Sequence, residues 1–191
     1  MSTLNAPASH DLASLVAMRL THDLAGPLGA VATAIDLLDG GDPEIRALIA
    51  DGAATAVASL RLHRFILSPS DDGSSAHGIL AAWVALREGV TLDWRAAPTT
   101  AAVVLGLAMT ATEAARRGGT LTVDGDAVSF APAPTLDPAV VAGLSGEAVT
   151  SARGSFAALL HADAVRRGGA IAVATDAAAL RLTYHGRALP R

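Results

Sequence analysis

The chain has 191 residues, of which 51% are hydrophobic and 3% aromatic, and its formal net charge is −4. This length can bury a sizeable core, which must be built mainly from Ala, Leu and Val. The negative charge argues against nucleic acid as the main partner. The absence of cysteine excludes disulfides, thiolate nucleophiles and thiolate metal sites. With no apolar run of about eighteen residues and no signal-peptide pattern, we expect a cytoplasmic protein without a membrane partner.

Residues 1–10 are expected to form a flexible tail, and residues 11–68 a helical hairpin. Along residues 11–39, apolar side chains recur at spacings of three and four, which predicts one long amphipathic helix. Its apolar seam consists of Leu20, Leu24, Leu28, Val31, Ile35 and Leu38. Gly40-Gly41 is predicted to end this helix, and Asp42-Pro43 to begin a second one that runs to Leu67. Because a hairpin cannot bury all its apolar surface alone, we expect a homodimer in which two hairpins form a four-helix bundle.

Residues 69–76 are rich in turn formers and predict a linker, followed by a second domain over residues 77–191. Periodicity predicts helices over residues 77–87, 99–117 and 152–167, and a short helix after Asp137-Pro138. Strands are predicted over residues 90–94, 120–124, 127–131, 170–175 and 179–184. These elements predict an α/β domain whose sheet is antiparallel or mixed, with helices mostly on one face. The fold class expected for the whole chain is therefore α+β.

Two segments of this second domain resemble each other. Residues 115–123 read Ala-Arg-Arg-Gly-Gly-Thr-Leu-Thr-Val, and residues 165–173 read Val-Arg-Arg-Gly-Gly-Ala-Ile-Ala-Val. We interpret each copy as a last helical turn with two cations, a glycine stop and a strand. The alternative interpretation is that the arginine pairs bind anions.

His22 is the strongest candidate for chemistry among the histidines. It lies about 200° around the helix from Leu20 and from Leu24, and therefore opposite the seam. The other residues on its face, mostly small, are Met18, Ala25, Gly26, Gly29 and Thr33. Each interior glycine costs about 1 kcal/mol relative to alanine, and Pro27 removes an amide and predicts a kink. Such costs are tolerated if a partner's backbone must approach the histidine. The alternative is an ordinary surface histidine beside glycines that serve helix packing.

His22-Asp-Leu-Ala-Gly-Pro27 resembles the phosphoacceptor box of histidine-kinase dimerisation domains, in which His-Glu or His-Asp is followed by a proline five residues after the histidine. Residues 22–30, 35–38 and 59–65, with the Arg-Arg-Gly-Gly segments, resemble the ChpT-type histidine phosphotransferases in the same order over nearly the whole chain. The resemblance implies a dimeric four-helix bundle followed by a degenerate relative of the histidine-kinase ATPase domain. It also implies a phosphorelay intermediate. In such a relay, the resemblance implies, phosphate would pass from the receiver domain of a hybrid histidine kinase to His22, and from there to a response regulator.

The residue types suit this chemistry. A neutral imidazole is a good nucleophile because its unperturbed pKa is about 6.5. Asp23 is expected to orient one ring nitrogen and to support the developing positive charge, which leaves the other nitrogen to attack phosphorus. The resemblance assigns Mg²⁺ to the receiver, so no metal ligand or other cofactor is expected in this chain. Arg61 or Arg64 is predicted to lie close to the phosphorylated histidine and to ease its charge, and both are assigned to the surface that binds the receiver. The alternative for both is a solvated surface arginine.

Two departures from the kinases narrow the expected activity. Gly26 stands where kinases with phosphatase activity usually carry Thr or Asn, so the resemblance does not favour intrinsic phosphatase activity. The helix over residues 99–117 has no asparagine, and no Asp-x-Gly-x-Gly or Gly-x-Gly-x-Gly motif occurs. Asp124-Gly-Asp126 instead predicts a hairpin turn. We therefore predict a phosphotransferase that does not bind ATP. The alternatives are a non-catalytic adaptor that docks receivers and, less favoured, a divergent histidine kinase.

Overall fold

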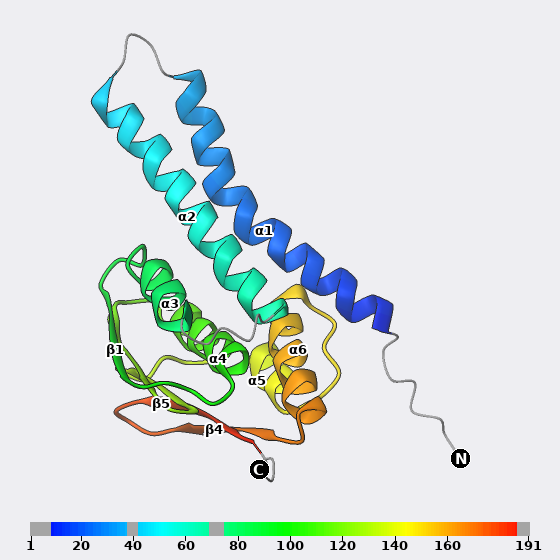
Figure 1. The fold of residues 1–191 in the computed structure, drawn as a ribbon. Coiled ribbons are helices and arrows are strands. Elements are labelled where there is room, and N and C mark those ends of the chain that lie inside the picture. Colours follow the sequence, from blue (N-terminus) through cyan, green and yellow to red (C-terminus); the bar gives the residue numbers. More distant parts are fainter. Residues whose placement is uncertain (1–8, 38–41, 69–74, 187–191) are drawn as a thin grey trace.

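The computed structural model describes residues 9–37, 42–68 and 75–186. Most of the expected tail, Leu38, the Gly40-Gly41 stop and nearly all of the expected linker lie outside the described residues. A long helical hairpin extends from a second part, in which helices cover a sheet (Figure 1). The α+β class predicted from the sequence is confirmed.

The hairpin consists of α1 (Ser9–Asp36) and α2 (Pro43–Leu67). The second helix has the predicted bounds, and the Asp42 side chain caps it by accepting the backbone N–H of Glu44 at 2.8 Å. The first helix begins two residues earlier than expected and continues through Pro27. Gly52 lets the helices approach closely, because an added Cβ would lie 2.7 Å from the Cγ2 atom of Val31.

The apolar seam of α1 is only partly covered within one chain. Leu20, Leu24 and Val31 are half-buried. Leu28 and Ile35 are 53% and 55% exposed. The large apolar side chains of α2 that are also exposed are Leu48, Val57, Leu60 and Leu67. A single hairpin thus leaves a substantial part of its apolar surface in contact with solvent.

The second part begins with α3 (Ala76–Val84) and contains one five-stranded sheet. Its strands are β1 (Val90–Ala96), β2 (Gly119–Asp124), β3 (Ala127–Ala131), β4 (Ala170–Thr175) and β5 (Leu180–His185). The strand order is β1-β2-β3-β5-β4, with β1 and β2 parallel and the other neighbours antiparallel. The sheet is therefore mixed, which is one of the two kinds predicted, and strand bounds differ from the prediction by at most two residues at an end.

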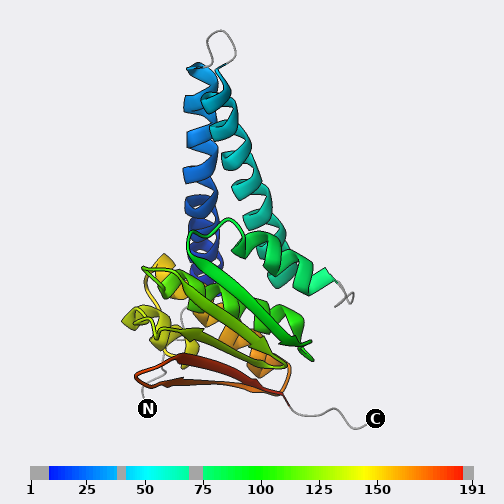
Figure 2. The same cartoon turned by 90° about the vertical axis from the view of Figure 1, so that its left-hand side faces the viewer.

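Three further helices, α4 (Ala101–Ala114), α5 (Pro138–Leu144) and α6 (Ala152–Arg166), lie with α3 on one side of the sheet (Figures 1 and 2). The helix α4 is almost wholly buried, as its continuous apolar sequence requires. The buried core continues from this layer into the end of α2, through Leu62, Phe65 and Ile66. This continuity holds the base of the hairpin against α4 and α6. In the described residues, no helix is long and apolar enough to cross a membrane.

The repeated Arg-Arg-Gly-Gly segments differ in structure. The second copy is as predicted, with Arg166 in the last turn of α6 and Gly168 at a φ of +74°. In the first copy the prediction is wrong, because α4 ends at Ala114, and Arg116 and Arg117 follow the helix. The chain must leave the helix early, since the backbone of Gly118 packs directly on Gly89. A Cβ at Gly118 would lie 2.1 Å from the Gly89 carbonyl oxygen.

The Asp124-Gly-Asp126 turn joins β2 and β3 as predicted. Gly125 has a φ of +59°, a conformation that favours glycine. The Asp126 carboxylate accepts the backbone N–H of Thr99 at 2.8 Å and the Thr99 hydroxyl, so the turn also holds the start of α4.

Candidate functional site

His22 lies on the outer face of α1, and its side chain is 86% exposed. Its Nδ1 atom is 3.4 Å from Oδ1 of Asp23. The other ring nitrogen, Nε2, has no hydrogen-bond partner among the described residues. The imidazole therefore has one nitrogen beside a carboxylate and one available to an approaching molecule.

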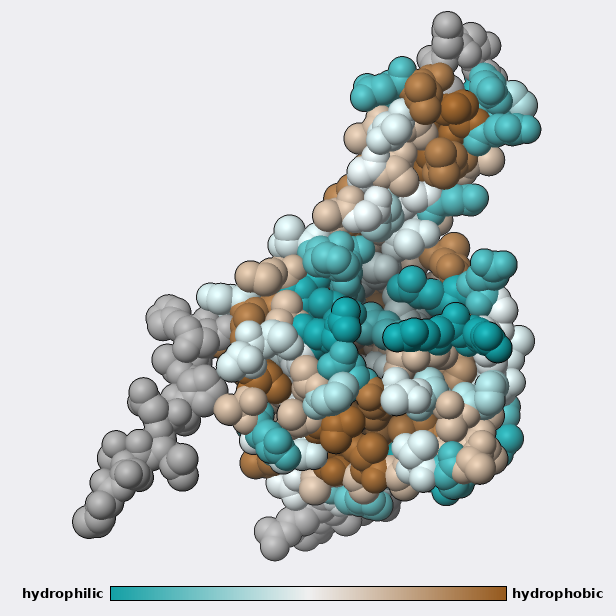
Figure 3. Space-filling view, turned by 180° about the vertical axis from the view of Figure 1, so that it is seen from behind, coloured by the Kyte–Doolittle hydropathy of each residue, from teal (hydrophilic) through white to brown (hydrophobic). Residues whose placement is uncertain are grey.

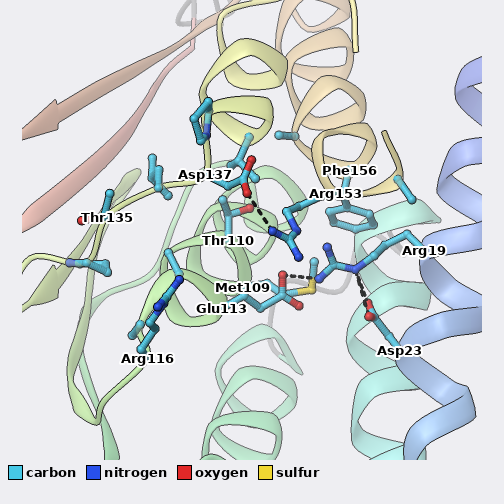
Figure 4. A pocket seen from close by; sticks show the side chains of 18 of the residues that line it. Arg19, Asp23, Met109, Thr110, Glu113, Arg116, Thr135, Asp137, Arg153 and Phe156 are labelled. Carbon is cyan, nitrogen blue, oxygen red and sulfur yellow. Dashed lines mark hydrogen bonds and ion pairs between the residues drawn. The ribbon is translucent and has the colours of Figure 1, made fainter. Parts of the chain in front are cut away.

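Asp23 is turned inward and is much less accessible than its neighbour, with a side chain 17% exposed. Arg19, one helical turn earlier, donates from Nε to both carboxylate oxygens at 3.0 and 2.8 Å. The same guanidinium donates from Nη2 to Oε2 of Glu113 on α4, at 2.7 Å (Figure 4). One cation thus lies between two carboxylates that come from different parts of the fold.

His63 of α2 packs behind this group. Its side chain is 4% exposed, and its Nε2 atom lies 3.7 Å from Oδ2 of Asp23. The Nδ1 atom is 2.8 Å from the carbonyl oxygen of Ser59 and must donate, because a carbonyl only accepts. The ring of Phe156 meets His63 edge-on, with 5.5 Å between centroids. Burial lowers the pKa of His63, so this imidazole is neutral near pH 7.

Burial also affects the charged pair that joins α1 to α4. It raises the pKa of Glu113, and the positive charge of Arg19 opposes this rise without cancelling it. For Arg19, burial acts to lower the pKa, but the charges of Glu113 and Asp23 outweigh it and raise the pKa overall. Arg19 is therefore held in its charged form by the two carboxylates, whereas Glu113 remains disfavoured in its charged form despite the nearby guanidinium.

A cavity of about 1140 Å³ opens beside His22, between α1, α4, α6 and the segment that precedes α5 (Figure 4). Arg116, Arg117 and Arg153 line it, and Arg153 donates to Asp137 at 2.9 Å. This hydrogen bond, together with the backbone N–H of Ala139, lowers the pKa of Asp137. The surface where the hairpin meets the second domain is accordingly hydrophilic, whereas the distal end of the hairpin is more hydrophobic (Figure 3).

The other predicted residues of the His22 face all lie at the surface. Met18 is 60% exposed and also lines the cavity. Gly26 and Gly29 are exposed, and a Cβ added at either position meets no described atom within 4 Å. Contacts within the described chain therefore do not explain these glycines. The remaining members of this face, Ala25 and Thr33, are exposed as well.

Arg61 and Arg64 are exposed on α2, and neither lines the cavity beside His22. Among the described residues, Asp23 contacts the His22 imidazole, and neither arginine forms a hydrogen bond or ion pair with it. Pro27 is half-buried and contributes its backbone oxygen to the contact with Gly52.

Three residues of this site were not found by sequence reasoning. Arg19 and Asp23 have the spacing of a helical ion pair, which was a usable signal. His63 lies on α2, and nothing in its local sequence indicates that it is buried beside Asp23. Glu113 lies 94 positions from Arg19, and nothing local in the sequence relates the two. Within the described ranges, no cluster of three or more His, Asp or Glu side chains could hold a metal ion.

Comparison with known proteins gives a result at the level of the fold. No family model matches the chain, and no curated protein matches it by sequence. A solved structure of a bacterial phosphotransferase is similar over 96% of this chain and 98% of its own, with a TM-score of 0.79 and 21% identity. The structure of full-length ShkA in complex with AMPPNP aligns over 95% of this chain and 47% of its own, with a TM-score of 0.36 and 18% identity. The chain thus shares the fold of a bacterial phosphotransferase over nearly its whole length.

Proposed function

We propose that this protein is a histidine phosphotransferase of a bacterial phosphorelay, and that His22 carries the phosphoryl group. The observation that carries the proposal is the geometry of His22, an 86% exposed imidazole with one nitrogen beside Asp23 and the other facing outward. The fold shared with a bacterial phosphotransferase supports it. The donor is the phosphorylated aspartate of a hybrid-kinase receiver domain, and the acceptor is the aspartate of a response regulator.

The reaction follows from the two ring nitrogens. When Asp23 accepts a hydrogen bond from Nδ1–H of His22, the lone pair lies on Nε2. The Nε2 atom then attacks phosphorus in line, so that the N–P bond forms while the bond from phosphorus to the aspartyl oxygen breaks. The negative charge of Asp23 stabilises the imidazolium character of the product. The second transfer reverses these steps on the response regulator, and Mg²⁺ acts in the receiver domain.

The receiver is proposed to dock on the exposed face of α1. Small residues around His22 leave room for a partner's backbone, and Gly26 and Gly29 have open space where a side chain would project. Met18 extends this face toward the cavity. Arg61 and Arg64 remain proposed contacts of the receiver through their exposed positions on α2.

The protein is further proposed to be a homodimer whose hairpins form a four-helix bundle. The exposed apolar side chains on α1 and α2, among them Leu28, Ile35 and Leu48, support this assembly. Burying such residues is the main driving force for association between helices in water.

The test is transfer from phosphorylated receiver domains to the wild-type protein and to His22→Gln, with His185→Gln as the control. His185 is exposed and lies at the end of β5. Wild type and control should acquire acid-labile, base-stable phosphate, and His22→Gln should acquire none. Label on His22→Gln would overturn the assignment. Receiver binding that survives His22→Ala, with no phosphate ever found on the wild type, would identify a non-catalytic adaptor.

A further inference from the structure

Glu113 belongs to the second domain, yet its carboxylate reaches the phosphoacceptor helix. Its Oε2 atom accepts from Nη2 of Arg19 at 2.7 Å, and Nε of the same guanidinium donates to Asp23 (Figure 4). The planar guanidinium can serve both carboxylates at once because its donors point along separate edges. The orientation of Asp23 is thereby tied to α4.

The carboxylate of Asp23 has two histidines beside it. Oδ1 lies 3.4 Å from Nδ1 of His22, and Oδ2 lies 3.7 Å from the buried Nε2 of His63. Arg19 donates to both oxygens and so fixes the plane of the carboxylate between the two rings. Any movement of the guanidinium changes how Oδ1 is presented to His22.

Charge makes this arrangement depend on all three groups. If Arg19 is lost, two carboxylates face each other without a cation between them, which is costly in a partly buried place. If the charge of Glu113 is lost, the Nη2 end of Arg19 keeps only a neutral acceptor, and the pull of the guanidinium toward α4 is weakened. In both cases the restraint on the orientation of the Asp23 carboxylate is weakened.

We propose that Arg19 and Glu113 are positioning residues for phosphoryl transfer, through which the second domain holds Asp23 so that it accepts the Nδ1 hydrogen of His22 and leaves Nε2 to attack. This inference rests on the proposed function of His22. It gives the second domain a part in the reactivity of a histidine that lies on a different element.

The first test is Glu113→Gln, which keeps the size of the side chain and removes its charge. Single-turnover transfer from a phosphorylated receiver should be about tenfold slower at saturation, whereas the receiver concentration for half-maximal rate stays unchanged. Arg153→Ala is the matched control, because Arg153 lines the same cavity but pairs with Asp137. It should leave the transfer rate unchanged. Arg19→Lys keeps the charge but not the planar fork, and should slow transfer in the same way.

A double-mutant cycle separates positioning from a general structural effect. In an Asp23→Asn background, adding Glu113→Gln should cause no further loss of rate, because both substitutions act through one carboxylate. A second measurement needs no receiver domain. In the ring-nitrogen NMR spectrum of His22, Glu113→Gln should reduce the population of the Nδ1–H tautomer. His185 provides the reference resonance in the same sample.

The outcomes distinguish the two proposals. If wild type is labelled on His22 and Glu113→Gln transfers equally fast with an unchanged tautomer, the positioning role is overturned and the proposed function stands. The same holds if Glu113→Gln causes equal losses with and without Asp23. If the wild type never acquires phosphate, the proposed function fails, and the inference that rests on it fails too.

Discussion

The buried imidazole of His63 points its Nε2 atom at the carboxylate of Asp23, 3.7 Å away. Its other nitrogen donates to the backbone oxygen of Ser59, so Nε2 carries a lone pair when the ring is neutral. A second proton would place an N–H in front of Asp23 and compete with His22 for the same carboxylate. Burial disfavours that proton, and this gives the site a measurable dependence on pH.

Stability should fall in mild acid because of His63. Its pKa is lower in the folded state than the ordinary value of about 6.5 in the unfolded chain, so the unfolded chain binds the proton first. The free energy of unfolding is therefore not reduced by His63 above pH ~6.5. It decreases as the pH falls from there toward the lower pKa of the folded state, by at most about 1.4 kcal/mol per pH unit.

Urea denaturation of wild type and His63→Gln across this range measures the effect. The variant should show a shallower decline in the free energy of unfolding. The raised pKa of Glu113 acts in the opposite direction, but it is present in both proteins and drops out of the difference. Parallel pH profiles would contradict the prediction.

Arg19→Ala should destabilise the fold more than removal of an exposed arginine. The side chain of Arg19 is 19% exposed and separates two carboxylates, so we expect a loss of about 1–2 kcal/mol. Arg153 is 70% exposed, and Arg153→Ala should cost no more than about 0.5 kcal/mol. Chemical denaturation at neutral pH compares the two, and equal losses would mean that the Arg19 pair contributes no more than a surface ion pair.

Glycine substitutions should separate stability from partner binding. Gly26→Ala adds a methyl group in open space and should raise the stability by up to about 1 kcal/mol, while it weakens receiver binding at the proposed docking face. Gly52→Ala should instead lower the stability, because its Cβ would meet Val31 at 2.7 Å. Thermal melting and titration with a receiver domain provide both readouts. Undiminished receiver affinity in Gly26→Ala would move the docking face elsewhere.

The exposed apolar side chains near the end of the hairpin should hold two subunits together. Ile35 and Leu48 are 55% and 48% exposed, and replacing both by arginine should convert a dimer into a monomer. Val165→Arg is the control, since Val165 is 55% exposed on α6, outside the hairpin. Light scattering after size exclusion gives the mass directly. A wild-type monomer would rule out the four-helix bundle.

Periodicity and turn chemistry were sufficient to predict most of the fold. The Asp42-Pro43 start of α2 and the Gly125 turn are local signals, and both were read correctly. The end of α4 was placed too late because the contact of Gly118 with Gly89 is made across the sheet and leaves no local pattern. Asp23 could be predicted beside His22 because it is the next residue in the chain. Glu113 could not, because only folding brings it to Arg19. Helical spacing relates neighbours along one helix and says nothing of a partner that folding brings from another.

The helix α4 is held at both of its ends. Asp126 accepts the backbone N–H groups of Thr99 and Thr100 before its first turn, and Glu113 binds Arg19 at its last. Its length is about 20 Å, and its interior is packed on every side. A substitution in the turn at Asp126 can therefore shift Glu113 without altering any residue near the histidine.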